Sequence, residues 1–242
     1  RFYSPQMNVH LMERLSLESG LRLAMEREEL ALLYQPRVGV RDGQVGGVEA
    51  LMRWHHPTQG TISPAEFVPV AEDSGLIAGI GEWVLHSACR QLRAWREQGL
   101  PMLRMAVNIS SKQFLQDSLI QVVREALHQT GIEPARLELE ITEEMVIRNP
   151  ERAARLCAQF KELGVGLVID DFGTGYSSLS HLRRLPIDSV KIDRSLILEL
   201  PHSPDAAAMS RAVVAMAHSL GIAVTAEGVE TAEQWEFLHQ LG

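Results

Sequence analysis

Residues 136–141, with the sequence RLELEI, and residues 165–170, VGLVID, flank the segment 150–163, PERAARLCAQFKEL. The two outer segments are short and apolar, which is typical of β-strands, whereas the middle segment is long and amphipathic, which is typical of a helix. Gly164 follows the helical segment, where a left-handed cap is expected. The second strand is almost continuously apolar, as a parallel strand is when helices cover one face and a barrel core fills the other. The stretch therefore predicts a βα unit with parallel strands.

The same alternation of strand and helix continues on both sides of this unit. Arg41-Asp42-Gly43 is a tight-turn signature, so we expect the first two strands to form an antiparallel hairpin and the others to be parallel. Ser63-Pro64-Ala65-Glu66 marks a helix start, and further helix caps are expected at Gly131 and Gly221. The seven expected strands are residues 30–40, 44–52, 103–109, 136–141, 165–170, 189–192 and 222–226, with further helices at 117–129, 150–163 and 205–220. We predict an α/β fold, a modified TIM (β/α)8 barrel with an antiparallel first strand.

The two ends of the chain lead to expectations about the parent protein. Seven strands do not close an eight-stranded barrel, so we expect the last strand to lie beyond Gly242, missing from this chain. Residues 1–12 have no strong hydrophobic period, and the chain lacks an initiator methionine. We therefore expect residues 1–14 to be a linker or the tail of an upstream domain, and residues 15–242 to be the barrel domain, truncated before its final strand.

Composition and charge exclude several classes of protein. Of the 242 residues, 45% are hydrophobic and 22% are charged, which favours a folded globular domain over a disordered one. The net charge is −8 and no long basic run occurs, so we expect no binding to a nucleic-acid polymer. Cys89 and Cys157 are too few for a disulfide framework, and no apolar run approaches the length of a membrane span. We expect a cytoplasmic protein, or the cytoplasmic part of a larger membrane-anchored one.

Polar side chains stand at the carboxyl ends of the expected strands, where barrel enzymes carry their chemistry. These residues are Glu49, Asn108, Glu140, Asp170, Asp171, Lys191 and Glu227. Because side chains alternate along a strand, Glu140 shares a face with Glu138 and points toward the barrel axis. Asp170 and Asp171 would point oppositely on a regular strand. Both reach one site only if the chain bends nearby, as the glycines in Phe172-Gly173-Thr174-Gly175 permit.

Five carboxylates at one end of a barrel need positive charge nearby. A solvated charge or a helix cap explains any single one equally well, but like charges so close together repel one another. Divalent cations neutralise such a group, and oxygen ligands without a neighbouring Cys or His favour Mg²⁺ or Mn²⁺. Asp170 is placed to bridge two ions. Lys191 is costly to bury without these carboxylates, and Arg53 either binds a phosphate or forms a strand-end salt bridge.

Seven short motifs occur in order along the chain. They are Tyr34-Gln35-Pro36, Glu49-Ala50-Leu51-Met52-Arg53-Trp54, Asn108-Ile109-Ser110, Glu140-Ile141-Thr142-Glu143, Asp170-Asp171-Phe172-Gly173-Thr174-Gly175, Lys191-Ile192-Asp193 and Glu227-Gly228-Val229-Glu230. Together they resemble the EAL-domain cyclic-di-GMP phosphodiesterases, a family with a modified TIM barrel whose first strand is antiparallel. The resemblance implies hydrolysis of the bacterial second messenger cyclic di-GMP to linear pGpG. It also implies in-line attack by a metal-bound water, with two Mg²⁺ or Mn²⁺ ions per active site.

The resemblance further implies a role for each residue of the site. One metal ion is implied to bind Glu49, Asn108, Glu140 and Asp170. The second is implied to bind Asp170, Asp171 and Glu227. The implied catalytic residues are Lys191, Glu227, Glu49 and Asp170, with Lys191 as the one that orients or activates the attacking water. Glu143 matches an anchor of the loop at residues 171–179, and Arg53 and Gln35 match substrate-binding positions.

The resemblance also implies partners and leaves two other activities open. A homodimer through the EAL domain is implied, as is an upstream regulatory domain, either a sensor or a GGDEF domain, whose exit Arg1-Phe2-Tyr3-Ser4 resembles. The last strand of the family carries a Gln-Gly motif that would lie beyond Gly242. One alternative is a catalytically silent EAL receptor that binds cyclic di-GMP without cleaving it. Another is a barrel enzyme that uses the same carboxylates for metal-assisted proton abstraction.

Overall fold

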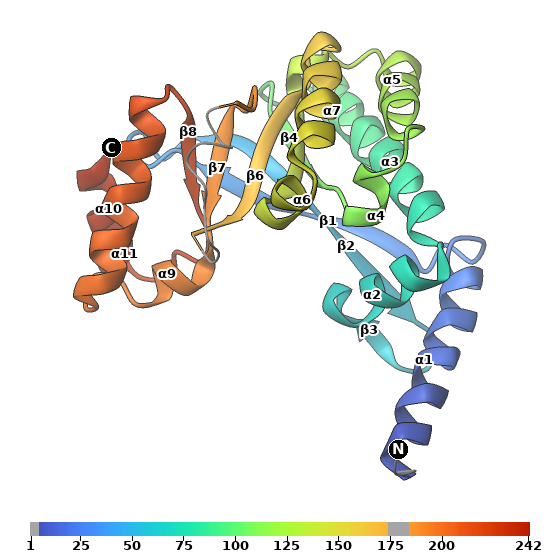
Figure 1. Cartoon of the computed structure of the whole chain (residues 1–242). Coiled ribbons are helices and arrows are strands. Elements are labelled where there is room, and N and C mark those ends of the chain that lie inside the picture. The colour runs from blue at the N-terminus through green and yellow to red at the C-terminus, as the bar shows by residue number, and fades with distance from the viewer. Residues whose placement is uncertain (1–4, 174–183) are drawn as a thin grey trace.

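Strands alternate with helices along the chain, as Figure 1 shows. The computed structural model describes residues 5–173 and 184–242, and of residues 5–11 and 13 it describes the backbone alone. The strands are β1 (Leu30–Val38), β2 (Val45–His56), β3 (Gly60–Ile62), β4 (Arg104–Asn108), β5 (Leu137–Thr142), β6 (Gly166–Phe172), β7 (Ser189–Ile192) and β8 (Ala223–Ala226). The helices are α1 (Pro5–Ala24), α2 (Pro64–Ser74), α3 (Ile77–Glu97), α4 (Ser111–Phe114), α5 (Leu119–Thr130), η1 (Pro134–Arg136), α6 (Glu143–Arg148), α7 (Pro150–Glu162), α9 (Arg194–Leu198), α10 (Pro204–Ser219) and α11 (Ala232–Leu241).

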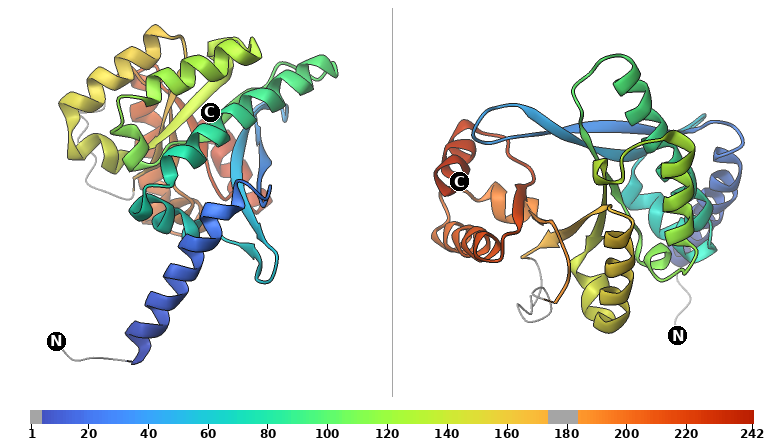
Figure 2. Two further views of the ribbon diagram at one scale, coloured as in Figure 1. Left: turned by 90° about the vertical axis from the view of Figure 1, so that its right-hand side faces the viewer. Right: turned by 90° about the horizontal axis from the view of Figure 1, so that it is seen from above.

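The strand order confirms the predicted architecture. The strands follow the order β1-β2-β4-β5-β6-β7-β8, and the short β3 pairs with β2. β1 and β2 are antiparallel, with Gln35 opposite Glu49, and each later pair of neighbours in this order is parallel. Helices lie on the outer side of the curved sheet, as Figure 2 shows from above. The fold is therefore an α/β modified TIM barrel with an antiparallel first strand.

Local signals at the ends of helices also act as predicted. The hydroxyl of Ser63 caps α2 by accepting a hydrogen bond from the backbone N–H of Ala65 at 3.3 Å. Gly131, Gly164 and Gly221 follow α5, α7 and α10 with φ values of 63°, 84° and 69°. These values lie in the left-handed region, so the three glycines end their helices as the sequence predicts.

Helix α1 begins within residues 1–14, the segment that the sequence analysis expected to be a linker or the tail of an upstream domain. The chain is helical from Pro5 to Ala24, because proline is tolerated in a first helical turn and no further proline interrupts the segment. Arg22 donates a hydrogen bond to Glu18 one turn earlier at 2.8 Å, and Leu21 is buried in the core. The helix thus continues across residue 14, where the expected linker ends, and the division into linker and domain stays a prediction.

Strand β3 is a second element that the sequence analysis did not predict. β2 continues beyond its predicted end at Met52 as far as His56, and Trp54 pairs with Ile62 across the resulting hairpin. The imidazole of His56 accepts hydrogen bonds from the backbone N–H groups of Thr58 and Gln59 at 3.3 and 3.2 Å, which closes the turn. Three-residue strands carry too little periodicity to be recognised in a sequence.

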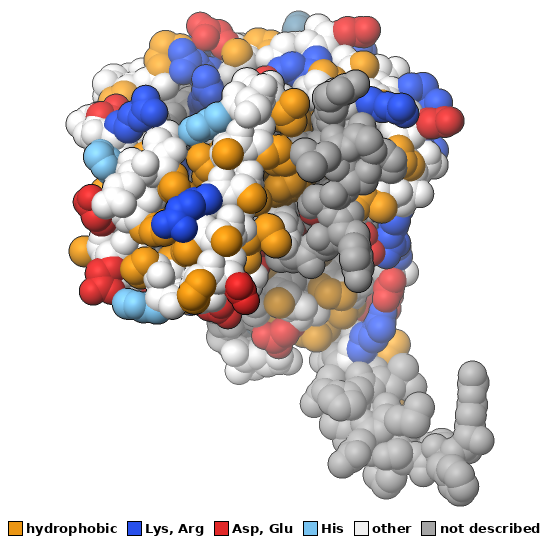
Figure 3. Space-filling model, turned by 60° about the vertical axis from the view of Figure 1, so that its left-hand side comes forward, with side chains coloured by type: hydrophobic (Ala, Val, Ile, Leu, Met, Phe, Trp, Pro, Cys, Tyr) orange, Lys and Arg blue, Asp and Glu red, His pale blue; other side chains and the backbone are white. Residues whose placement is uncertain are grey.

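The described surface mixes charged and apolar side chains. Over α10 and α11, Figure 3 shows basic, acidic and apolar groups intermingled, with no continuous basic area on the described part of that face. This mixture agrees with the net charge of −8. Among residues 5–173 and 184–242, no helix combines the length and the apolar character that crossing a bilayer requires.

Buried Gln113 joins α4 to α3 directly after β4. Its side-chain oxygen accepts from the backbone N–H of Ser110 at 3.3 Å, and the Ser110 hydroxyl accepts from the backbone N–H of Gln113 at 3.2 Å. This reciprocal capping box fixes the start of α4. The amide group lies directly on Gly81 of α3, where a methyl group would come within 1.5 Å of Gln113 Nε2.

Substituting Gly81→Ala is therefore expected to lower the free energy of unfolding by about 1–3 kcal/mol, because the added methyl displaces a buried, hydrogen-bonded amide. Urea denaturation followed by circular dichroism measures this change. Gly79→Ala is the matched control, since it lies in the same helix with open space around it. The control should be neutral or more stable by up to about 1 kcal/mol. Equal stabilities of the two variants would contradict the contact.

Both cysteine thiols are free and buried, Cys89 in α3 and Cys157 in α7. Burial raises the pKa of each thiol to about 12. At pH 8 almost no thiolate is therefore present in the folded chain. Because the thiolate is the reactive form, the folded chain should react with Ellman's reagent only as fast as it opens. Both thiols should react within seconds in denaturant. Rapid labelling of either thiol in the folded chain would show that its helix does not pack as described.

Candidate active site

Polar residues from five neighbouring parallel strands, and from the segment after β8, meet at one end of the barrel. Their positions follow from strand register, because Asn108 lies opposite Glu140, Thr142 opposite Asp170, and Lys191 opposite Thr225. Glu227 comes directly after β8, and its backbone N–H donates to the carbonyl of Ile192 at 3.1 Å. The carboxyl ends of neighbouring parallel strands therefore bring these side chains to one edge of the sheet.

The ammonium group of Lys191 is the centre of this group. It is 1% exposed, and its Nζ lies 2.8 Å from Glu140 Oε2 and 2.5 Å from Glu227 Oε1. Glu49 Oε2 and Asp170 Oδ2 lie at 3.1 and 3.3 Å from the same nitrogen. Four carboxylates from four different segments thus surround one buried cation, which balances only part of their charge.

An amide extends the cluster on the side of β4. Asn108 Nδ2 donates a hydrogen bond to Glu49 Oε1 at 2.7 Å, so both carboxylate oxygens of Glu49 accept, one from the amide and one from Lys191. Asn108 follows the β-branched and apolar run of β4 and immediately precedes Ile109 and the α4 cap. The capping box that starts α4 therefore also fixes the end of the strand that carries Asn108.

The electrostatics of the cluster show an excess of negative charge. Burial, with smaller contributions from Glu49 and Asp170, raises the pKa of Glu140 above its ordinary value, against the opposing effect of Lys191. Burial likewise raises the pKa of Glu227. For Lys191, burial acts to lower the pKa, but the carboxylates of Glu140, Asp170 and Glu49 outweigh it and raise the pKa above its ordinary value. Lys191 therefore stays protonated at neutral pH, and the site favours additional cations.

The chain bends at the end of β6, as two adjacent aspartates at one site require. Asp171 has a φ of 56°, and the pairing with β7 shifts register between Ile169 and Phe172. The bend begins at Asp171 and continues at Gly173, which has a φ of 98° and is one of the glycines that the sequence analysis named. Of those, Thr174 and Gly175 lie outside the described residues. Burial, followed by the nearby charges of Asp170 and Asp193, raises the pKa of Asp171.

The donor chemistry of the cluster fits divalent metal ions. Its side chains offer carboxylate and amide oxygens, which are the ligands that Mg²⁺ and Mn²⁺ prefer. Oε1 of Glu140 is buried and has no hydrogen-bond partner among the described residues, so it is available as an acceptor. Within residues 5–173 and 184–242, no three His, Cys, Asp or Glu side chains are arranged around a common metal position, because the carboxylates turn toward Lys191. Metal binding therefore requires these side chains to turn from the ammonium group.

The remaining predicted residues lie around the cluster. Arg53 lies on β2, on the same face as Glu49, and its Nη1 donates to the carbonyl of Met52 at 2.8 Å. Among the residues that the structure describes, Arg53 forms no ion pair, and its binding of a phosphate stays a prediction. Gln35 pairs with Glu49 across the hairpin and is exposed. Gln35 is thus directly opposite Glu49, and Arg53 lies four residues further along the same strand.

Glu143 is the first residue of α6 and is only 7% exposed. Its Oε2 is buried without a hydrogen-bond partner among the described residues. The loop that the sequence analysis assigned to it, residues 171–179, lies largely outside the described residues, so the anchoring role of Glu143 stays a prediction.

Two polar groups near the barrel axis were not assigned by the sequence analysis. Asp193 caps α9 by accepting from the backbone N–H of Ser195 at 2.9 Å, and an Asp two residues before a Ser at the end of a strand is the signal that could have identified it. Glu138 lies two residues before Glu140 on the same face of β5. It forms ion pairs with Arg37 and with Arg104, the latter at 3.3 Å. This second layer joins β1, β4 and β5.

The fold and the site together define an α/β-barrel protein whose strand ends form a buried, acidic, oxygen-donor centre around one lysine. The family model described as the EAL domain matches residues 18–242. The chain therefore belongs to the EAL-domain family, which confirms the resemblance drawn from the motifs.

Curated relatives share this region of sequence. The bifunctional diguanylate cyclase/cyclic di-GMP phosphodiesterase MucR of Pseudomonas aeruginosa is 48% identical over 100% of this chain and 35% of its own length. The cyclic di-GMP phosphodiesterase PdeR of Escherichia coli is 40% identical over 99% of this chain and 36% of its own length. The chain thus spans about a third of the length of these relatives.

Solved structures show the same fold. The phosphodiesterase PaMucR in complex with c-di-GMP superposes with a TM-score of 0.91 at 48% identity, covering 94% of this chain and 92% of that one. The EAL enzyme Bd1971, in a form bound to cAMP and cyclic di-GMP, has a TM-score of 0.90 at 30% identity, covering 98% and 66%. The likeness confirms the modified barrel that the strand order shows.

Proposed function

We propose that this chain hydrolyses one phosphodiester bond of cyclic di-GMP to give linear pGpG, with the help of divalent metal ions. The observation that carries the proposal is the cluster of four carboxylates around Lys191 at the strand ends of an EAL-domain chain. The substrate is proposed from the relatives, since MucR and PdeR are named cyclic di-GMP phosphodiesterases and the PaMucR structure holds c-di-GMP.

Metal ions are part of the proposal because of charge. A phosphodiester is an anion, and it approaches a centre whose carboxylates outnumber the ammonium group of Lys191 four to one. The residues proposed to hold two Mg²⁺ or Mn²⁺ ions are Glu49, Asn108, Glu140, Asp170, Asp171 and Glu227. When bound, the ions supply Lewis-acid stabilisation of charge on the phosphoryl oxygens and lower the pKa of water.

The chain's own residues then have separate tasks. Because the carboxylates raise its pKa, Lys191 stays protonated, so it orients the attacking water or a phosphoryl oxygen by donating from Nζ and does not act as a base. Glu227 is 31% exposed and has a raised pKa, which suits it to accept a proton from water. Arg53 is placed to bind a phosphate of the substrate, with Gln35 beside it on the hairpin.

The test is to incubate the chain with cyclic di-GMP and Mn²⁺ or Mg²⁺, with a parallel sample in EDTA, and to separate the nucleotides by chromatography. We expect linear pGpG with either metal and none with EDTA. Binding of cyclic di-GMP without any product at saturating metal would replace the proposal with the silent-receptor alternative. Product that forms equally well in EDTA would remove the metal from the mechanism.

The setting of the chain is part of the same proposal. Because the chain spans about a third of MucR and PdeR, we propose that its parent protein carries further domains, among them an upstream regulatory domain such as a sensor or a GGDEF domain. A cytoplasmic location and a homodimer through the EAL domain are also proposed, on the family resemblance alone. Light scattering after size exclusion, with and without cyclic di-GMP, tests the dimer.

A further inference from the structure

The loop between β8 and α11 carries Glu227 but has no regular structure of its own. β8 ends at Ala226, and residues 227–231 belong to neither a strand nor a helix. Yet Glu227 Oε1 lies 2.5 Å from Lys191 Nζ. Holding this short contact requires the loop to be fixed relative to β7, which carries Lys191.

One buried side chain fixes this loop at its far end. Gln234 of α11 is 4% exposed, and its Oε1 accepts from the backbone N–H groups of Glu230 and Thr231 at 2.7 and 3.0 Å. The Thr231 hydroxyl accepts in return from the backbone N–H of Gln234 at 3.2 Å. The acceptor end of one amide therefore holds the two residues that follow the Glu227 turn.

The donor end of the same amide binds the segment that follows Lys191. Gln234 Nε2 donates to the carbonyl of Ile197 at 3.1 Å, a buried bond. Ile197 lies in α9, which starts directly after β7 and is capped by Asp193. The side chain of Gln234 thus links the segment that follows Glu227 to the segment that follows Lys191.

A second, weaker contact links the same two segments. Arg194 Nη2 lies 2.6 Å from Glu230 Oε1, but both side chains are more than half exposed, so this ion pair adds little. The side chain of Arg194 also covers Gly228, whose φ is 71° and where a Cβ would come within 2.4 Å of Arg194 Cγ. The loop therefore approaches the start of α9 closely at Gly228 and at Glu230.

We propose that Gln234 is a positioning residue that sets the place of Glu227 relative to Lys191. This inference rests on the proposed function, because it is Glu227 as a proposed metal ligand beside Lys191 that the amide holds in place. Removing the amide would leave the partly buried N–H groups of Glu230 and Thr231 without their partner, and the Ile197 carbonyl would keep only backbone donors such as the N–H of Leu200. The loop would then exchange between positions, and Glu227 would spend less time at the site.

The test compares Gln234→Met with Gln240→Met, which lies in the same helix and loses only an exposed bond to Glu236. For Gln234→Met we expect kcat for cyclic di-GMP to fall about 10–100-fold, with KM changed less than kcat. The Mn²⁺ concentration for half-saturation, measured by electron paramagnetic resonance without substrate, should rise by about tenfold or more. Amide hydrogens of residues 227–231 should exchange faster. Gln240→Met should match the unmodified chain in all three.

A purely structural role would lower only the melting temperature, so a folded Gln234→Met with unchanged Mn²⁺ affinity and loop exchange would overturn the proposal. If Gln234→Met does not fold, Gln234→Glu decides by the same readouts, since its carboxylate can still accept from Glu230 and Thr231 but cannot donate to Ile197. If the unmodified chain hydrolyses nothing, the proposed function fails, while Mn²⁺ affinity and loop exchange still decide the role of Gln234.

Discussion

Substituting Lys191→Met is expected to lower kcat for cyclic di-GMP hydrolysis by about 100–1000-fold and to destabilise the metal-free chain. The first effect follows from losing the donor that orients the reacting groups. The second follows from leaving Glu140, which is buried, without its cation at 2.8 Å, a change that typically costs about 3–5 kcal/mol. Saturating Mn²⁺ should restore most of the stability, because it neutralises the same carboxylates, but it should not restore kcat.

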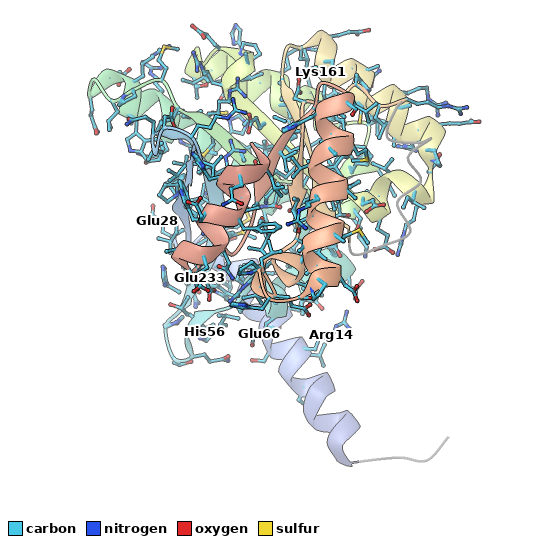
Figure 4. The ribbon with its side chains drawn as sticks, turned by 90° about the vertical axis from the view of Figure 1, so that its left-hand side faces the viewer. Arg14, Glu28, His56, Glu66, Lys161 and Glu233 are labelled. Carbon is cyan, nitrogen blue, oxygen red and sulfur yellow. The ribbon has the colours of Figure 1, made fainter. Side chains whose placement is uncertain are left out.

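Urea denaturation with and without Mn²⁺ measures the change in stability, and product formation at saturating metal measures the change in kcat. Lys161→Met is the matched control, since Lys161 forms a partly exposed pair with Asp188 at 2.8 Å. Figure 4 shows Lys161 near the top of the molecule, well separated from Glu233, which follows the Glu227 loop. The control should cost no more than about 1 kcal/mol and leave kcat unchanged. A Lys191→Met chain as stable as wild type without metal would mean that the carboxylates are not ionised around it.

The positions of most site residues could be predicted because they depend on only two rules. Parallel strands in a barrel bring their carboxyl ends together, which places Asn108, Glu140 and Lys191 at one edge. Alternation along a strand then turns Glu140 inward, and it is 1% exposed in the structure. Both rules are local or follow from the fold class, so they need no knowledge of particular side-chain contacts.

Other features could not be predicted because they depend on contacts between distant segments. The sequence marks Thr231 and Gln234 as a helix start, but only the packing of α11 on α9 shows that Gln234 binds Ile197. The ion pairs of Glu138 likewise join three strands that are far apart in the chain. Helix α1 could not be predicted for a different reason, since residues 1–12 show no hydrophobic period that indicates a helix.

Substituting Glu49→Gln is expected to abolish most hydrolysis while leaving the fold and the binding of cyclic di-GMP intact. Each oxygen of Glu49 accepts one hydrogen bond, from Asn108 at 2.7 Å and from Lys191 at 3.1 Å. A glutamine amide offers only one oxygen, so its NH₂ group must face another donor, and one negative charge is lost from the proposed metal site. We expect kcat to fall by about 100-fold or more and Mn²⁺ to bind about 10–100-fold more weakly.

Product formation across a Mn²⁺ titration, paired with calorimetric binding of cyclic di-GMP in EDTA, separates these effects. Glu144→Gln is the control, because this glutamate lies on α6 with 71% of its side chain exposed and, among the described residues, pairs with Arg148 alone. The control should match the unmodified chain in both measurements. If Glu49→Gln retains activity within about tenfold, Glu49 cannot be a ligand of a metal that the reaction requires. A receptor would behave differently again, since neither substitution could reduce a hydrolysis that the unmodified chain does not perform.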